Sequence, residues 1–152
     1  MPITNDHELK AALASLGGVQ RRQALSLLIQ GALDLSADVR VRSALAVASR
    51  ADASEAELAA AAAAVNSARV ASYTQCGHEA NWSNSAGHFV ARAAQECVKP
   101  EVSLAEAWDA AMQARMARIC QHVAAGEVAG DGEAEAQYRA LEVFLRRKEG
   151  QS

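Results

Sequence analysis

Six consecutive alanines, Ala59–Ala64, are the feature that most limits what this chain can fold into. Alanine has the highest intrinsic helix propensity of the amino acids. The run follows Ser54 and Glu57, which have the spacing of a capping box at the start of a helix. The segment therefore predicts a helix from Ser54 to about Ser72, and its methyl-sized side chains let neighbouring helices approach closely. We expect this helix to lie at the centre of the fold, with a dimer interface as the alternative.

Similar start and stop signals divide the rest of the chain into helices. Ser103 and Glu106 form a second capping box, and Gly17 and Pro100 mark places where a helix stops. These signals predict helices over residues 5–16, 19–34, 39–50, 54–72, 103–125 and 133–148, and a further helix that ends near Cys97. The connections are short, which predicts a single all-α domain over residues 1–152. Its expected form is a compact antiparallel bundle of about six or seven helices, with a short α-solenoid as the alternative.

The predicted helix over residues 103–125 carries large apolar side chains at helical spacing. They recur every three or four residues, which places them on one side of the helix. We interpret this side as a stripe that faces the core, in preference to the lining of a small-molecule pocket. The stripe consists of Trp108, Met112, Met116, Ile119 and Val123.

Charge and composition argue against several classes of partner. The net charge is −3 and the basic residues do not gather into one field, so we expect no nucleic-acid partner. The longest unbroken apolar run, residues 58–65, is far shorter than the ~20 residues that span a bilayer, so we expect no membrane partner. The N-terminus lacks an apolar signal segment, and the three cysteines are too widely spaced for a zinc motif or a disulfide framework. We therefore expect a reduced, cytoplasmic protein without a cofactor.

A polar segment, residues 76–89, interrupts this alanine-rich background with histidines, asparagines and a glutamate. Polar residues crowded among apolar helices indicate either a hydrogen-bonded internal network or a recognition surface. On a regular helix, ~100° per residue places Asn81, Ser85 and His88 on one stripe that continues to Arg92. The candidate binding residues are His78, Asn81, Asn84, Ser85, His88 and Arg92.

The same segment offers an alternative function, a small-ligand or metal-binding domain that could act as an enzyme. A metal ion needs three or four converging N, O or S ligands, and the set available here is Cys76, His78, Glu79 and His88. The two histidines are ten residues apart and fall on different faces of a continuous helix, so they do not form a two-histidine clamp. We expect instead a non-enzymatic protein in which both histidines bond to neighbouring helices and differ in burial.

The sequence Gly77-His78, followed by Asn84, His88 and the segment Ala91-Arg92-Ala93-Ala94, resembles an alanine-rich helical family of immunity proteins from bacterial polymorphic toxin systems. The resemblance implies an all-α bundle without enzymatic activity. It also implies a protein partner, a cognate toxin that the helical surface binds and neutralises. Self-association into a homodimer is a further expectation, because the alanine-rich helix suits close packing against a second copy.

Overall fold

The computed structural model describes residues 2–76, 82–127 and 132–150, with side chains for 2–71, 85–127 and 132–150. Within these ranges the chain is helical and contains no strand, which confirms the predicted all-α class. No helix in the described ranges is both long and apolar enough to cross a membrane. The helices are α1 (Asp6–Ala14), α2 (Gly18–Gln30), α3 (Val39–Ala48), α4 (Glu55–Cys76), α5 (Trp82–Cys97), α6 (Leu104–Ala124) and α7 (Gly132–Gly150), with a short 3-10 helix, η1 (Leu33–Leu35).

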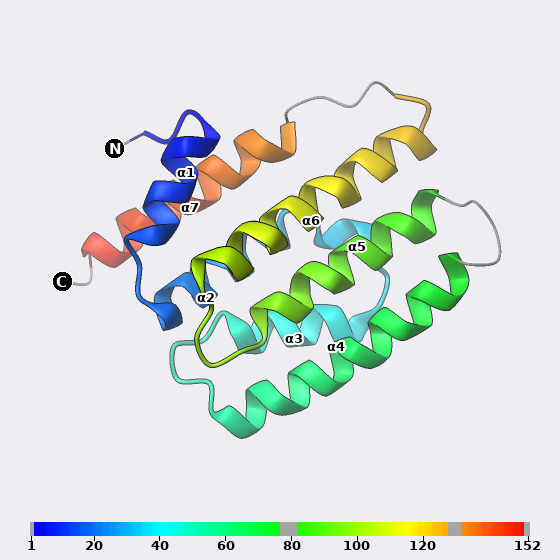
Figure 1. The fold of residues 1–152 in the computed structure, drawn as a ribbon, viewed down its shortest axis with the longest axis horizontal. Coiled ribbons are helices and arrows are strands. Elements are labelled where there is room, and N and C mark those ends of the chain that lie inside the picture. The colour runs from blue at the N-terminus through cyan, green and yellow to red at the C-terminus, as the bar shows by residue number, and fades with distance from the viewer. Residues whose placement is uncertain (1, 77–81, 128–131, 151–152) are drawn as a thin grey trace.

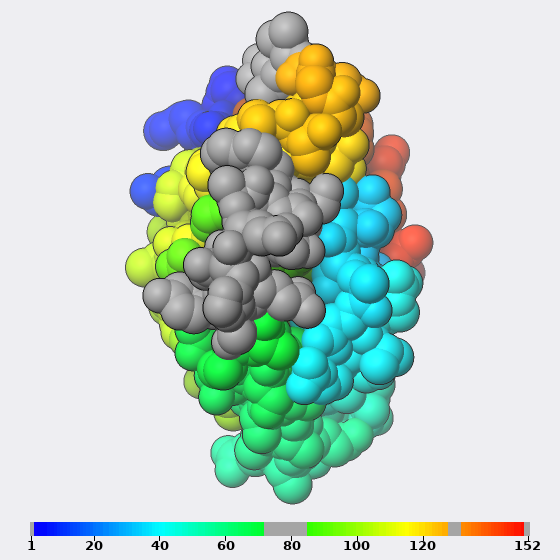
Figure 2. Space-filling view, turned by 90° about the vertical axis from the view of Figure 1, so that its right-hand side faces the viewer, coloured from blue at the N-terminus to red at the C-terminus, as the bar shows by residue number. Residues whose placement is uncertain are grey.

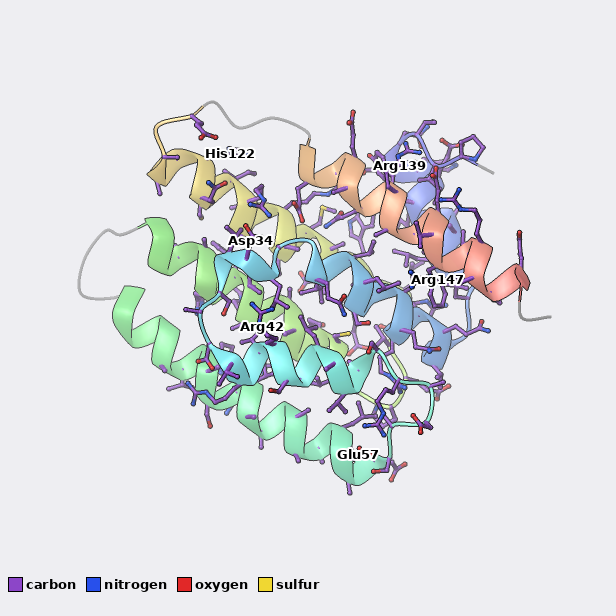
Figure 3. All side chains as sticks on the ribbon, turned by 180° about the vertical axis from the view of Figure 1, so that it is seen from behind. Asp34, Arg42, Glu57, His122, Arg139 and Arg147 are labelled. Atoms are coloured by element: carbon purple, nitrogen blue, oxygen red, sulfur yellow. The ribbon has the colours of Figure 1, made fainter. Side chains whose placement is uncertain are left out.

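The helices form two layers (Figure 1). In the front layer, α4, α5 and α6 run side by side, and α5 and α6 make the most extensive contact between any two described helices. Behind them, α2 packs on α5 and α6, and α3 packs on α4 and α5; Figure 3 shows the same two helices from the other side. Helices α1 and α7 close the edge beside α6. The arrangement is a bundle of antiparallel neighbours, as the short connections predicted.

The predicted capping boxes begin two of the longest helices. Ser54 Oγ accepts a hydrogen bond from Glu57 N at 3.0 Å, and Glu57 Oε1 accepts one from Ser54 N at 3.1 Å. Ser103 and Glu106 repeat the arrangement at the start of α6, at 3.1 and 3.0 Å. These reciprocal bonds satisfy amide groups that a helix start otherwise leaves without partners. The two motifs therefore fix where α4 and α6 begin.

Two predicted helix ends were wrong. Helix α2 ends at Gln30, and η1 follows it, whereas the prediction continued the helix to residue 34. The carbonyl of Gly31, at the end of α2, accepts from Arg118 Nη2 at 2.9 Å, and Asp34 pairs with the same guanidinium. This tertiary contact stabilises the early stop. Helix α4 runs beyond residue 72 to Cys76.

The expectation that the alanine-rich helix is central was also wrong. Helix α4 lies at the edge of the front layer and contacts only α3 and α5 extensively (Figure 1). Its inner face is buried, whereas Ala59, Ala60 and Ala63 are exposed. An alanine run has the same small side chain on every side, so it does not indicate which face is buried. The buried residues of the described part of this helix are Leu58, Ala61, Val65 and Ala68.

A buried arginine links the two helices of the back layer by hydrogen bonds. Arg22 is 2% exposed, and its guanidinium donates to the carbonyls of Ala48 at 3.0 Å, Arg50 at 2.6 Å and Pro100 at 2.6 Å. Two of these carbonyls lie at the end of α3, where the helix dipole favours a cation. Arg22 thus joins α2 to the end of α3 and to the loop after α5.

A polar network joins α1, α6 and α7. Arg115 donates to both carboxylate oxygens of Asp6, at 3.0 and 2.7 Å, and to Gln137 Oε1 at 2.9 Å. The Tyr138 hydroxyl donates to Asp6 Oδ1 at 2.7 Å. The hydrogen bond from Arg115 lowers the pKa of Asp6 below its usual range. The network holds α1 and α7 against the outer edge of α6.

Candidate functional site

Part of the predicted polar segment lies outside the residues that the structure describes. His78, Glu79 and Asn81 fall in the gap between α4 and α5, and the side chains of Cys76 and Asn84 are also outside the description. Their proposed roles in binding, and the predicted difference in burial between the two histidines, remain predictions.

The described members of the candidate site lie on α5. Ser85, His88 and Arg92 follow one another at helical spacing, so the regular helix brings them onto one side, as predicted. Ser85 and His88 are half-buried, and Arg92 is exposed. We call these three residues the α5 ridge. At this end of the bundle, which Figure 2 views, η1 lies against α5, and a Cβ on Gly87 would lie 3.5 Å from the carbonyl oxygen of Leu35, an ordinary contact distance.

His88 forms part of the contact between α5 and α4. It hydrogen-bonds to the backbone of Arg69 on α4, and its ring centroid lies 6.2 Å from that of Phe89. Burial lowers the pKa of His88, and the charge of Arg92 lowers it further, which favours the neutral ring. On the same side of α5, Gln95 Nε2 lies 3.5 Å from Asn66 Oδ1 of α4. The histidine therefore has the structural role expected of a satisfied bundle histidine.

Arg92 is the member of the α5 ridge that reaches solvent. Its guanidinium carbon lies 5.9 Å from the ring centroid of Phe89. A planar guanidinium held over an aromatic ring still presents its outward donors to a carboxylate or a carbonyl of another molecule. Arg92 therefore supplies a positioned cation on the outer face of the front layer.

The predicted core stripe of α6 faces outward, which corrects the sequence interpretation. Met116, Ile119 and Val123 are 42%, 39% and 43% exposed, and Trp108 and Met112 are half-buried. The opposite face of α6, which packs against the other helices, is built of alanines instead. Its fully buried alanines are Ala107, Ala110, Ala111, Ala114 and Ala117.

The size of these side chains explains the reversal. Helix α5 also turns alanines inward, including Ala93 and Ala94, and it makes its most extensive contact with α6. Methyl-sized side chains on both helices permit an axial separation near the short end of the usual ~8–10 Å. Leucine-sized or methionine-sized side chains would force the two backbones apart. The sequence carried a sign of the ambiguity, because the alanines of α6 form a second apolar face with the same helical period.

We call Trp108, Met112, Met116, Ile119 and Val123 the α6 stripe. Lys10 Nζ lies 5.2 Å above the Trp108 ring at one end, and a shallow hollow of about 460 Å³ opens there. At the other end, His122 Nδ1 lies 2.9 Å from Glu127 Oε2. Helices α2 and α3 cover the back of the front layer, and Figure 1 views the opposite side of that layer. We call this side the front face, and we infer that it carries the exposed side chains of the α6 stripe and the α5 ridge.

The described residues offer few groups for metal binding or thiol chemistry. Within them, no group of three or more His, Cys, Asp or Glu side chains could hold a metal ion. Cys97 and Cys120 are buried, and burial raises the pKa of the Cys97 thiol to about 12. Since the thiolate is the nucleophilic form, Cys97 is unsuited to nucleophilic catalysis near neutral pH. The predicted metal ligands lie largely outside the described residues, and that alternative stays open.

A hollow of about 640 Å³ lies between the N-terminal segment, α1 and α7. Its carboxylates have structural partners. Glu142 accepts from the backbone N–H of Ile3 at 2.6 Å, and Glu8 accepts from the hydroxyl and amide of Thr4. These contacts attach the N-terminal segment to α7, so the hollow follows from that attachment.

By its fold the protein is an all-α helical bundle. None of the family models, curated proteins or solved structures with which the chain was compared matches it. The function therefore has to follow from the chemistry of the exposed front face.

Proposed function

We propose that this protein is a non-enzymatic binding module of the immunity type, which acts in the cytoplasm and neutralises a cognate toxin protein. The surface that would hold the toxin is the front face, with the α6 stripe at its centre and the α5 ridge at its rim. The observation that carries the proposal is the exposure of Met116, Ile119 and Val123 along one helix.

The composition of the front face is that of a protein-binding surface. Energetically important interface residues are enriched in aromatic residues, methionine and arginine, with an apolar centre inside a polar rim. The front face offers Trp108 and two methionines on α6, and Arg92 on the neighbouring helix α5. The helices beneath are fixed by close alanine packing, so little conformational entropy would be lost when the surface binds.

The resemblance to immunity proteins suggests that the partner is a toxin protein. The test is whether the purified protein binds the product of a toxin gene next to its own gene, and whether co-expression protects growth. We expect Met116→Glu to weaken binding by about 30-fold or more, because a charge would be buried at the apolar centre. Arg92→Ala should weaken it less, because a rim contact is worth less than a central one.

Val39→Glu is the matched control, since Val39 is 68% exposed on α3, outside the front face. It should bind like the wild-type protein. Failure to recover any neighbouring gene product, or unchanged binding by Met116→Glu, would count against the proposal. A stoichiometric transition metal in the purified protein, lost in His88→Ala, would favour the metal-binding alternative instead.

A further inference from the structure

The α6 stripe leaves three large apolar side chains exposed along one side of a single helix, because Met116, Ile119 and Val123 are 39–43% exposed. Helix α6 has 21 residues and is therefore about 31 Å long. The stripe follows its outer side from Trp108 to Val123 without a charged member. Contiguous exposed apolar patches on soluble proteins usually mark places where another molecule binds.

We infer that, in the absence of its toxin, the protein covers this stripe with the α6 stripe of a second copy, and that the two helices run antiparallel. A two-fold axis across α6 near Met116 places each apolar residue against an apolar residue of the other copy. Such an interface uses the same patch twice, so a surface must be complementary to itself. Helix α6 offers a largely apolar outer side of this kind, with the exposed Asp109 beside Trp108 at one end.

The charges at the two ends of the stripe favour the antiparallel arrangement. Lys10 lies over Trp108 at one end, where Asp109 lines the same hollow, and Glu127, held by His122, lies at the other. In an antiparallel pair, Lys10 of each copy faces Glu127 of the other. In a parallel pair, each lysine would face a lysine and each glutamate a glutamate. Opposite charges at an interface fix its register and exclude the repulsive alternative.

The consequence for regulation rests on the proposed function, because the toxin and the second copy would use the same stripe. Self-pairing would keep the stripe out of water until the toxin arrives. The toxin would then have to displace the second copy. The dimer would dissociate, and each toxin complex would contain one copy of the protein.

The experiment is sedimentation velocity of the full chain alone, from about 1 to 200 μM, a range that reveals a micromolar dissociation constant. We expect the wild-type protein to shift with concentration from the 16.0 kDa monomer towards twice that mass. Met116→Glu should weaken the dimer at least about tenfold, because two like charges would meet at the two-fold axis. Circular dichroism and thermal unfolding establish that the variant remains folded.

Two control variants place the same charge on other exposed apolar positions. Val39→Glu lies on α3, and Ala60→Glu lies on the exposed alanine face of α4. Both should dimerise like the wild-type protein. A wild-type chain that stays monomeric at 200 μM overturns the inference. A dimer that survives Met116→Glu, or is lost in Ala60→Glu, overturns it too, and the latter result would place the interface on α4.

Charge exchange tests the antiparallel arrangement. Lys10→Glu or Glu127→Lys alone should weaken the dimer about three- to tenfold, since each change creates two like-charge contacts per dimer. The double variant should recover most of the loss. If the double variant is weaker than either single variant, the antiparallel arrangement is wrong.

The two proposals fail in different ways. A protein that is monomeric alone but binds the toxin through Met116 contradicts the inference and leaves the proposed function standing. A dimer that depends on Met116, in a protein that binds no neighbouring gene product, contradicts the proposed function alone.

Discussion

The two faces of α6 are both apolar, yet they differ in side-chain size and in environment. The inner face consists of alanines that are fully buried, and the outer face carries Trp108, Met112 and three residues that are 39–43% exposed. Hydrophobicity alone would place the larger side chains inside, because burying them contributes more free energy. The structure places the small alanine face inside instead, and we attribute this to the small side chains of α5 that lie opposite.

Helix α5 explains this choice. It presents small inward residues to α6, and the pair packs more extensively than any other described pair. Close approach along two long helices gains many weak dispersion contacts that larger side chains would prevent. The large apolar residues of α6 are then left for another molecule to cover.

The largest expected effect on stability comes from a larger side chain on the buried inner face of α6. Ala114 is fully buried, so Ala114→Leu should overpack the core and lower the free energy of unfolding by about 1–3 kcal/mol. Met116→Leu, two residues along on the exposed face, should change it by no more than about 0.5 kcal/mol. Urea unfolding of the two variants gives the comparison. Equal effects would mean that the two faces of α6 have been assigned wrongly.

A pair of adjacent glycines sharpens the same contrast between crowded and open positions. A Cβ atom on Gly18 would lie 2.6 Å from Glu101 Cβ, whereas a Cβ on Gly17 would meet nothing within 4 Å. Gly18→Ser should therefore destabilise the protein by about 1 kcal/mol, because the loop after α5 must shift. Gly17→Ser should stabilise it by about 0.5 kcal/mol, because Gly17 is the N-cap of α2 and serine is a better cap. Thermal unfolding should shift in opposite directions for the two variants, and shifts of the same sign would contradict the packing of this loop.

The smallest expected effect on stability concerns the carboxyl group of Glu133, which lies between α6 and α7. Glu133 is 8% exposed, and burial raises its pKa above the usual 4.5 although Arg118 Nε lies 3.2 Å from Oε2. As pH rises from 4.5 towards the raised value, the unfolded chain loses its proton first, so folded stability falls. Glu133→Gln should remove this loss. At pH 7 its free energy of unfolding should equal that of the wild-type protein or exceed it by about 1 kcal/mol or less, and below pH 4.5 it should show no such gain.

Glu142 on the same helix is the control with the opposite sign. The Ile3 amide lowers the pKa of Glu142, so its contribution to stability is present above 4.5 and is lost as pH falls. Glu142→Gln should therefore be less stable than the wild-type protein at pH 7 and no different at low pH. Denaturant unfolding at several pH values measures both variants, and a loss of stability at pH 7 in Glu133→Gln would contradict the assignment.

Local signals predicted most of the fold. The capping boxes at Ser54 and Ser103 act over three residues, so the sequence alone identifies the starts of α4 and α6. The early end of α2 could not be predicted in this way, because Arg118, far along the chain, binds the Gly31 carbonyl. The candidate binding residues stay a prediction, and the structure shows only where the described ones lie. Arg92 is exposed as a binding residue should be, but His88 serves the contact with α4.

The main feature that the sequence left undecided was which face of α6 is buried. The helix has two periodic apolar faces, and periodicity gives no way to rank them. The choice depends on which residues of α5 stand opposite, which is known only once the two helices are paired. The alanine run of α4 has the same ambiguity, and the structure places that helix at the edge.

The most direct test of the outward direction of the α6 stripe is the rate at which a cysteine at each face reacts with a thiol reagent. Ala114→Cys and Met116→Cys differ by two positions on one helix, and peptide mass mapping separates them from the native cysteines. In dilute protein, where self-association is weakest, we predict fast modification of the cysteine at position 116 and strong protection at position 114 until the protein unfolds. Equal rates, or faster modification at position 114, would contradict the account.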